Sequence, residues 1–183
     1  MNSESWNFNS IDGLKVLNKI KCNKTIRAAY SKCFYGIKTG FNEAFIIDEK
    51  TKVKLENEDI SSKSIIKPFY EGKDIQKWNS QAIKKYLIFT RRGTKIEDYP
   101  AIKNYLNSFI EKLTPRNSPE QKVGRKPGPY QWYEIQDSVD YYKIFESPKI
   151  TWPNLQATNK FSIDTKGYYI NAPSVVFPNA DKT

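Results

Sequence analysis

The sequence predicts an α+β fold, in which short β-strands form one or more small mixed sheets and pack with about three helices. Two observations favour this class. Short apolar runs bounded by glycine, proline or charged residues recur along the chain, which is typical of strands. Segments with helical spacing lie between them, without a sustained βα alternation and without an internal repeat. With 183 residues and no obvious linker, we expect a single domain over residues 1–183.

Local patterns predict four elements in the first half of the chain. Apolar residues at helical spacing, with Ser10 as the N-cap, predict a helix over about residues 11–21. The apolar run at 44–48 predicts a buried strand, and the charged residues at 49–59 predict its exit and a loop. The other two elements are a short helix that Pro68 ends and a strand that leads into Arg91, at 61–66 and 86–90.

The clearest helical pattern covers residues 99–113, with Pro100 in the first turn and Asp98 as the expected cap. Its apolar residues fall on one face, which predicts a core helix. The segment that follows, 114–129, holds four prolines, two glycines and several basic residues. Such a composition excludes a regular element and predicts a long basic loop.

The aromatic-rich stretch at 130–153 is predicted to hold a strand, a short helix that begins at Ser138, and a second strand. We expect this stretch to form the scaffold, so that Trp132→Ala unfolds the domain while Arg125→Ala only weakens binding. The predicted strands are 132–136 and 149–152. After them, Thr165-Lys166-Gly167 predicts a hairpin of 161–164 with 168–171.

The composition favours a polyanionic partner. Lysine and arginine outnumber aspartate and glutamate by 30 to 20, and aromatic residues reach 14%. A basic excess of this size points to nucleic acid before membrane. A well-solvated, lysine-rich surface is the alternative. The large aromatic side chains provide enough apolar area for a core.

The chain has no histidine, which removes the commonest general base and the commonest transition-metal ligand. Its two cysteines, Cys22 and Cys33, make no CxxC motif, so neither a zinc site nor a redox site is indicated. No apolar run is long enough to span a membrane, and the N-terminus has no signal-peptide pattern. We therefore expect a cytoplasmic protein without a membrane partner.

Several segments read together indicate one family. They are YGIKTGFNEAFIID (35–48), IIKPFYEGKDIQKW (65–78), YLIF (86–89), YPAIKNYLNSFIEKLTPR (99–116), WYEIQDSVDYYKIFESPKITWP (132–153) and FSIDTKGYYIN (161–171). In this order they resemble the TaqI-like C-terminal specificity domain, the target-recognition part of N6-adenine DNA methyltransferases and Type IIG restriction–modification enzymes. The resemblance covers nearly the whole chain from about residue 25.

The resemblance implies a non-catalytic module that grips double-stranded DNA and reads base edges mainly from the major groove. An upstream methyltransferase domain of the same polypeptide would then use S-adenosylmethionine, so no cofactor is expected in this domain. No two prolines are adjacent here, so the Asn/Asp-Pro-Pro-Tyr motif of that catalytic domain is absent from the sequence. We expect residues 1–24 to form a helical connector to it, and the chain to be a piece of a longer enzyme.

Candidate DNA contacts are expected in loops, because lysine and arginine bind phosphates while arginine, lysine, asparagine and glutamine read base edges. For any single lysine, a solvated surface charge is the alternative. The candidates are Lys38, Thr39, Lys73, Arg91, Arg92, Arg116, Lys122, Arg125, Lys126, Gln131, Asn154 and Gln156. No catalytic residue and no metal ligand is expected.

Two other function classes stay open at this point. A metal-dependent nuclease could use Asp48, Glu49 and Lys50, which follow an apolar run as in a D/E-x-K half-site. A strand-end turn explains the same residues. A single-strand-binding or protein-interaction module could use exposed tryptophans at 78, 132 and 152, although aromatic residues beside aliphatic ones are usually core.

Overall fold

The computed structural model describes residues 10–23, 32–77, 84–118 and 120–179, and it divides the chain into two units, 1–33 and 34–183. The first unit holds the helix α1 (Ile11–Lys21). The hydroxyl of Ser10 accepts the Gly13 N–H at 3.2 Å, so the predicted helix and its cap are confirmed. The side chains of Ile11 and Ile20 are 75% and 61% exposed, and no described residue of α1 is buried.

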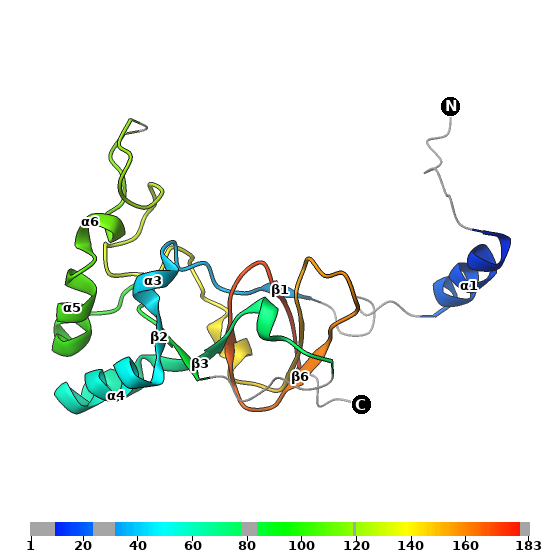
Figure 1. Cartoon of the computed structure of the whole chain (residues 1–183), viewed down its shortest axis with the longest axis horizontal. Helices are drawn as coiled ribbons and strands as arrows, with labels where there is room; N and C mark the ends of the chain where they lie inside the picture. Colours follow the sequence, from blue (N-terminus) through cyan, green and yellow to red (C-terminus); the bar gives the residue numbers. More distant parts are fainter. Residues whose placement is uncertain (1–9, 24–31, 78–83, 119, 180–183) are drawn as a thin grey trace. The chain divides into compact units, whose positions relative to one another are not determined.

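The second unit is built on two four-stranded sheets (Figure 1). The mixed sheet has the order β2-β4-β3-β7, with β3 and β7 parallel and the other pairs antiparallel. Its strands are β2 (Ile46–Asp48), β3 (Ile66–Tyr70), β4 (Lys85–Ile88) and β7 (Tyr169–Ile170). The predicted α+β class with a mixed sheet is confirmed.

The second sheet is antiparallel throughout and has the order β1-β8-β5-β6. Its strands are β1 (Phe34–Tyr35), β5 (Lys149–Trp152), β6 (Ser162–Asp164) and β8 (Val175–Pro178). Within the second unit, this sheet lies on the far side of the mixed sheet from the helices (Figure 1). The predicted strand at 149–152 is therefore confirmed.

The helices of the second unit are α3 (Asn42–Phe45), α4 (Glu49–Glu58), α5 (Pro100–Asn107) and α6 (Ile110–Leu113). Short 3₁₀ turns complete them: η1 (Ile60–Ser64), η2 (Gly72–Asp74), η3 (Ile96–Asp98) and η4 (Tyr142–Phe145). Helices α4, α5 and α6 gather at one end of the unit (Figure 1). The core beneath them includes Phe45, Ile102 and Leu106, each fully buried.

Two helix predictions need correction. Residues 49–59 were expected to be a loop, but most of them form α4, which the Asp48 carboxylate caps by accepting the Thr51 N–H at 2.8 Å. Only Leu55 of α4 is buried, so the apolar stripe that predicts a helix is missing. The helix predicted at 99–113 is broken after Asn107 into α5 and α6, and Tyr99 rather than Asp98 stands at the N-cap.

Three strand predictions also need correction. The run at 44–48 begins as the helical turn α3, so only its last three residues are a strand. Residues 132–136 form turns, because their carbonyls accept hydrogen bonds from arginine side chains instead of from a neighbouring strand. The hairpin predicted around Gly167 does not form: β6 pairs with β5, and β7 pairs with β3 in the other sheet.

Two strands had no clear pattern in the sequence. Pro68 was expected to end a helix, yet it lies within β3 opposite Tyr86 of β4. Pairing of β3 with β7 begins only at Phe69, so the missing N–H of Pro68 costs no ladder hydrogen bond on that side. Strand β8 lies between β1 and β5, where Val176 is fully buried.

Candidate nucleic-acid interface

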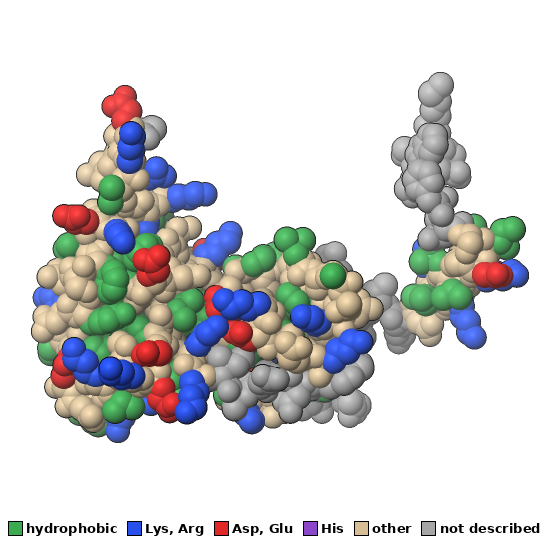
Figure 2. Space-filling view, viewed as in Figure 1, with side chains coloured by type: hydrophobic (Ala, Val, Ile, Leu, Met, Phe, Trp, Pro, Cys, Tyr) green, Lys and Arg blue, Asp and Glu red, His purple; other side chains and the backbone are tan. Residues whose placement is uncertain are grey.

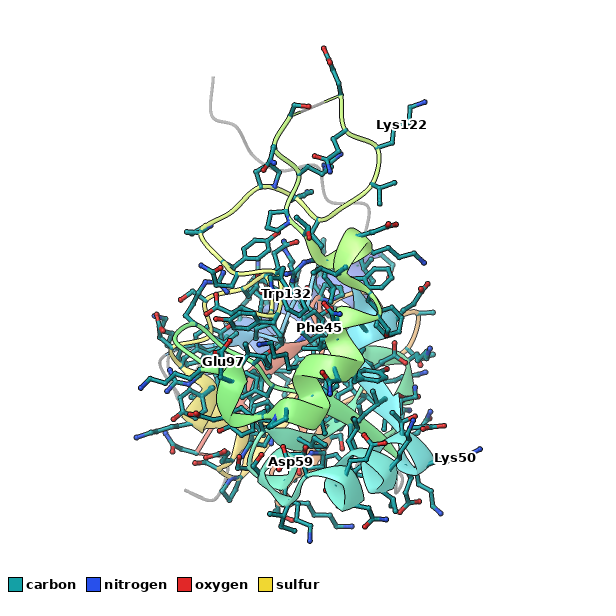
Figure 3. The ribbon with its side chains drawn as sticks, turned by 90° about the vertical axis from the view of Figure 1, so that its left-hand side faces the viewer. Phe45, Lys50, Asp59, Glu97, Lys122 and Trp132 are labelled. Atoms are coloured by element: carbon teal, nitrogen blue, oxygen red, sulfur yellow. The ribbon has the colours of Figure 1, made fainter. Side chains whose placement is uncertain are left out.

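A long basic loop, residues 114–129, projects from the helical end of the domain (Figures 1 and 3). The two sides of the loop meet at its base, where the Arg116 N–H donates to the Arg125 carbonyl at 2.9 Å and the Arg125 N–H donates to the Thr114 carbonyl at 3.1 Å. Lys122 lies on the projecting part (Figure 3). The predicted loop is confirmed, and its base is closed by backbone hydrogen bonds.

Arg125 holds the base of this loop inside the domain. The residue is only 4% exposed, and all five of its guanidinium N–H groups are used. They donate to the carbonyls of Leu113, Thr39, Glu134, Gln131 and Trp132 at 2.7, 3.0, 2.7, 3.2 and 2.9 Å. The guanidinium carbon also lies 4.5 Å from the centre of the Tyr130 ring and 5.5 Å from that of Phe45.

This environment corrects the expectation for Arg125. Burial lowers its pKa to about 10, so the group keeps its charge at neutral pH but has no donor left for DNA. These contacts instead predict that Arg125→Ala destabilises the domain, where the sequence predicted only weaker binding. A basic residue within a basic loop looks like a phosphate ligand in sequence, and only the packing shows that it points inward.

The neighbouring pair Arg91 and Arg92 divides into two roles. Arg92 is half-buried and donates to the carbonyls of Ile135 at 2.5 Å and Gln136 at 2.7 Å, with the Glu134 carboxylate 3.7 Å away. Arg91 is exposed, and its guanidinium lies 5.0 Å from the centre of the Tyr142 ring. Arg91 is therefore the member of the pair that can reach an anion.

Arg91 lies at a cavity of about 410 Å³ that also includes Lys67 and Lys95 in its wall. Lys67 is 3.5 Å from the Glu146 carboxylate, and Asp98 also lines the cavity. Three basic side chains and one carboxylate thus line this cavity. It is a second place, apart from the basic loop, where a phosphate could be held.

The loop at 36–40 shows the same division. Thr39 is 1% exposed, and its hydroxyl is 2.6 Å from the Asn42 side-chain oxygen. Lys38 is exposed, while its backbone N–H donates to the Asp137 carboxylate at 3.1 Å. Because Arg125 binds the Thr39 carbonyl, this loop and the base of the basic loop are fixed to each other.

The remaining candidates lie mostly on the surface. Lys122, Lys126 and Gln131 are exposed, whereas Arg116 is half-buried and donates to the Gln121 carbonyl at 3.4 Å. The side chain of Gln156 accepts the Lys160 N–H at 2.7 Å. Figure 2 shows Lys and Arg side chains over the projecting loop.

Lys73 and Asn154, far apart in the sequence, meet at one cavity. This cavity of about 210 Å³ is called the end pocket below. Its lining residues come from the ends of β3 and β5 and from the β7–β8 connection: Glu71, Gly72, Lys73, Pro153, Asn154, Leu155, Asn171, Pro173 and Ser174. Ser174 and Leu155 lie outside the motifs seen in the sequence, and Asn171 is the last residue of the motif at 161–171. No local pattern brings the three together, because the β7–β8 connection passes from one sheet to the other.

A family model described as the TaqI-like C-terminal specificity domain matches residues 67–183. The chain belongs to this family. The specificity-domain match begins at β3, so the motif at 35–48 lies outside it. The solved structure of the Type IIL restriction-modification enzyme MmeI in complex with DNA has a similar fold, with a TM-score of 0.53 and 13% identity.

That alignment covers 81% of this chain and 19% of the MmeI chain, so this chain corresponds to only a small part of that enzyme's length. At this identity the likeness concerns the fold alone. No helix among the described residues is long and apolar enough to cross a membrane.

The alternative nuclease residues have structural roles in this specificity domain. Asp48 caps α4, and the Thr51 N–H lowers the pKa of its carboxyl. Glu49 is paired with Lys84 at 3.1 Å. Over the described ranges, no group of three His, Cys, Asp or Glu side chains is placed to hold a metal ion. The nuclease hypothesis stays a prediction to be tested directly.

The tryptophan alternative is only partly visible. Trp132 and Trp152 are half-buried, with the Trp152 ring stacked 5.5 Å from Phe177. Trp78 lies outside the described residues. The two described tryptophans therefore pack within the specificity domain, which agrees with a scaffold role for the aromatic stretch.

Proposed function

We propose that this chain is the target-recognition domain of a restriction–modification adenine-N6 methyltransferase. In this proposal it binds double-stranded DNA sequence-specifically and carries out no catalysis itself. An upstream domain of the same polypeptide supplies the methyl transfer from S-adenosylmethionine, and residues 1–24 form the connection. Membership of the specificity-domain family supports the proposal.

The observation that carries the proposal is the basic loop, whose base is fixed by a buried arginine while its exposed lysines face solvent. Lys122 and Lys126 are exposed, and Arg125 holds the loop to the domain through five carbonyls. A fixed base limits the entropy lost when the lysines bind phosphates. Because the same arginine holds the loop that carries Lys38, both loops can grip one duplex together.

Counterion release gives a direct test. On the order of six phosphate contacts predicts a slope near −5 when the logarithm of the binding constant is plotted against the logarithm of salt concentration. The double variant Lys122→Ala/Lys126→Ala is expected to reduce that slope by about two and to weaken binding to all duplexes alike. The measurement is a fluorescence-anisotropy titration of labelled duplex at several salt concentrations.

Lys63→Ala provides the matched control, because Lys63 is exposed on η1 and outside the proposed surface. This variant should keep the wild-type slope. Competition with single-stranded DNA of the same sequence should favour the duplex. A flat salt response of the wild-type chain, or a preference for single strands, would contradict the proposal.

A further inference from the structure

The end pocket lies where the two sheets come together at one end. Gly72 of η2 follows β3, Pro153 to Leu155 follow β5, and Asn171 to Ser174 connect β7 with β8. Gly72 and Asn171 are tied by a hydrogen bond, in which the Gly72 N–H donates to the Asn171 side-chain oxygen at 2.9 Å. This bond joins the segments that follow β3 and β7 of the mixed sheet, while Pro153 to Leu155 at the end of β5 bring the other sheet to the pocket.

One polar group in this floor has no partner. Ser174 is 1% exposed, and its hydroxyl makes no hydrogen bond to any described residue. A methyl group on Gly72 would lie 2.6 Å from that hydroxyl, so the hydroxyl lies against Gly72 in the pocket wall. A buried hydroxyl without a partner costs about 1–3 kcal/mol. Its position at the pocket indicates a ligand that supplies the missing hydrogen bond.

Other groups at the pocket can read a base edge. Asn154 is exposed and no hydrogen bond holds its side chain within the described part of the chain. Asn171 uses its side-chain oxygen on Gly72, so its amide N–H groups remain as donors. Leu155 is 83% exposed, beside Asn154 in the same loop. An apolar side chain at such exposure next to free amides is typical of a contact surface, not of a core.

The charge and size of the pocket argue against phosphate or cofactor binding. Lys73 is paired with Glu71 at 2.9 Å, so the rim is close to neutral. The volume of about 210 Å³ is below the range of roughly 300–1,000 Å³ that encloses drug-sized ligands. A small, nearly neutral site that combines a hydroxyl, an amide and an exposed apolar side chain fits the edge of a base pair.

We infer that the end pocket reads one A·T base pair of the target duplex from the major groove, with Asn154 on adenine, Leu155 on the thymine methyl group and Ser174 completing the hydrogen bonds. Asparagine binds the N6 and N7 edge of adenine, and apolar side chains contact the thymine methyl. The N6 and N7 edge of adenine and the methyl group of thymine belong to the same A·T base pair, and both lie in the major groove. The inference rests on the proposed duplex binding and adds the base pair and the residues that select it.

The experiment begins with selection of duplexes from a random library by the full wild-type chain. The selected duplex is then resynthesised with uracil for thymine, or 7-deazaadenine for adenine, at each A·T pair in turn. One pair is expected at which each analogue weakens wild-type binding by roughly ten-fold. Leu155→Ala should abolish the uracil effect at that pair, and Asn154→Ala should abolish the 7-deazaadenine effect.

Ser174→Ala gives a readout that a structural role would not produce. Removing an unpartnered buried hydroxyl should leave the melting temperature unchanged or raise it, while the preference for that one base pair is relaxed. Ile60→Ala and Asn107→Ala are matched controls, because both residues are exposed and lie outside the pocket. These controls should keep both analogue effects.

The outcomes separate the two proposals. A wild-type chain that binds no duplex would overturn the proposed function and this inference with it. A selected target sequence in which no A·T pair shows both analogue effects would overturn the inference alone. The inference would equally be overturned if the analogue effects persisted at full size in Asn154→Ala and Leu155→Ala.

Discussion

At the scale of single residues, the arginines show that charge type does not determine role. Arg125 and Arg92 donate to carbonyls of residues 131–136, a segment without strand partners. A planar guanidinium with five donors can satisfy several carbonyls that point in different directions. Arg91, next in sequence to Arg92, is exposed and free to meet an anion. Which arginine faces inward depends on where the carbonyls lie.

Arg125→Ala is expected to lower the free energy of unfolding by at least about 3 kcal/mol, because each buried carbonyl left without a donor costs about 1–3 kcal/mol. Arg125→Lys should rescue it poorly, since an ammonium has three donors instead of five. Urea unfolding measures both variants. Lys126→Ala, at the exposed next position, should change stability by no more than about 0.5 kcal/mol. Wild-type stability of Arg125→Ala would show that the scaffold role is incorrect.

At the scale of elements, capping and pairing explain the differences from the sequence pattern. Helix α4 begins at a capping aspartate and carries the i,i+4 pairs Lys52–Glu56 and Lys54–Glu58 at 3.2 and 3.7 Å. Strands β5 and β6 are joined by the buried pair of Lys149 and Asp164 at 2.6 Å, and Lys149 also donates to the Phe145 carbonyl. Burial lowers the pKa of Lys149. The carboxylate of Asp164 also accepts the N–H groups of Lys166 and Tyr168, which turns the chain toward β7.

The cap of α4 separates a structural from a catalytic role for Asp48. Asp48→Ala should reduce the urea midpoint, because the Thr51 N–H loses its acceptor. Asp48→Asn should keep the wild-type midpoint, since asparagine caps helices about as well as aspartate. Neither variant should alter DNA binding. Magnesium-dependent nicking of plasmid DNA by the wild-type chain that Asp48→Asn abolishes would instead support the nuclease hypothesis.

At the scale of the second unit, its two sheets share one core. The Tyr70 hydroxyl of β3 lies 2.8 Å from the Thr151 hydroxyl of β5, and both residues are fully buried. Burial raises the pKa of Tyr70, so its hydroxyl stays neutral and able to donate. The ring of Tyr169 lies 5.1 Å from that of Phe145 and 5.0 Å from that of Phe89, which joins the aromatic stretch to the mixed sheet. We therefore expect the two sheets to unfold as one unit.

Tyr70→Phe tests this coupling. The variant should lose about 1–3 kcal/mol, because the buried Thr151 hydroxyl keeps no equivalent partner. Far-ultraviolet circular dichroism and tryptophan fluorescence should still report one coincident urea transition. Tyr35→Phe is the matched control, since Tyr35 is 59% exposed and should tolerate the change. Separate transitions for the two probes would show that the sheets unfold independently.

The sequence alone determined the fold class, the helix at 11–21, the strand at 149–152, the basic loop and the family. Each of these depends on local chemistry: a capping serine before an apolar stripe, a short apolar run, a proline-rich stretch and a set of ordered motifs. Elements were mistaken where long-range contacts replaced the local signal. Helix α4 has one buried residue and therefore lacks the apolar stripe that predicts a helix. Carbonyls of residues 132–136 accept hydrogen bonds from arginine side chains instead of from a neighbouring strand.

The candidate site divides in the same way. Sequence composition selected Lys122, Lys126 and Asn154 as surface contacts, and these residues are exposed. Only the tertiary structure decided that Arg125 and Thr39 point inward, because the carbonyls and the side chain that bind them come from distant or irregular segments. Ser174 and Asn154 line the same end pocket only because the tertiary structure brings the β7–β8 connection to the end of β5. Burial and hydrogen-bond geometry depend on segments that lie far apart in the chain, so no local pattern could have specified them.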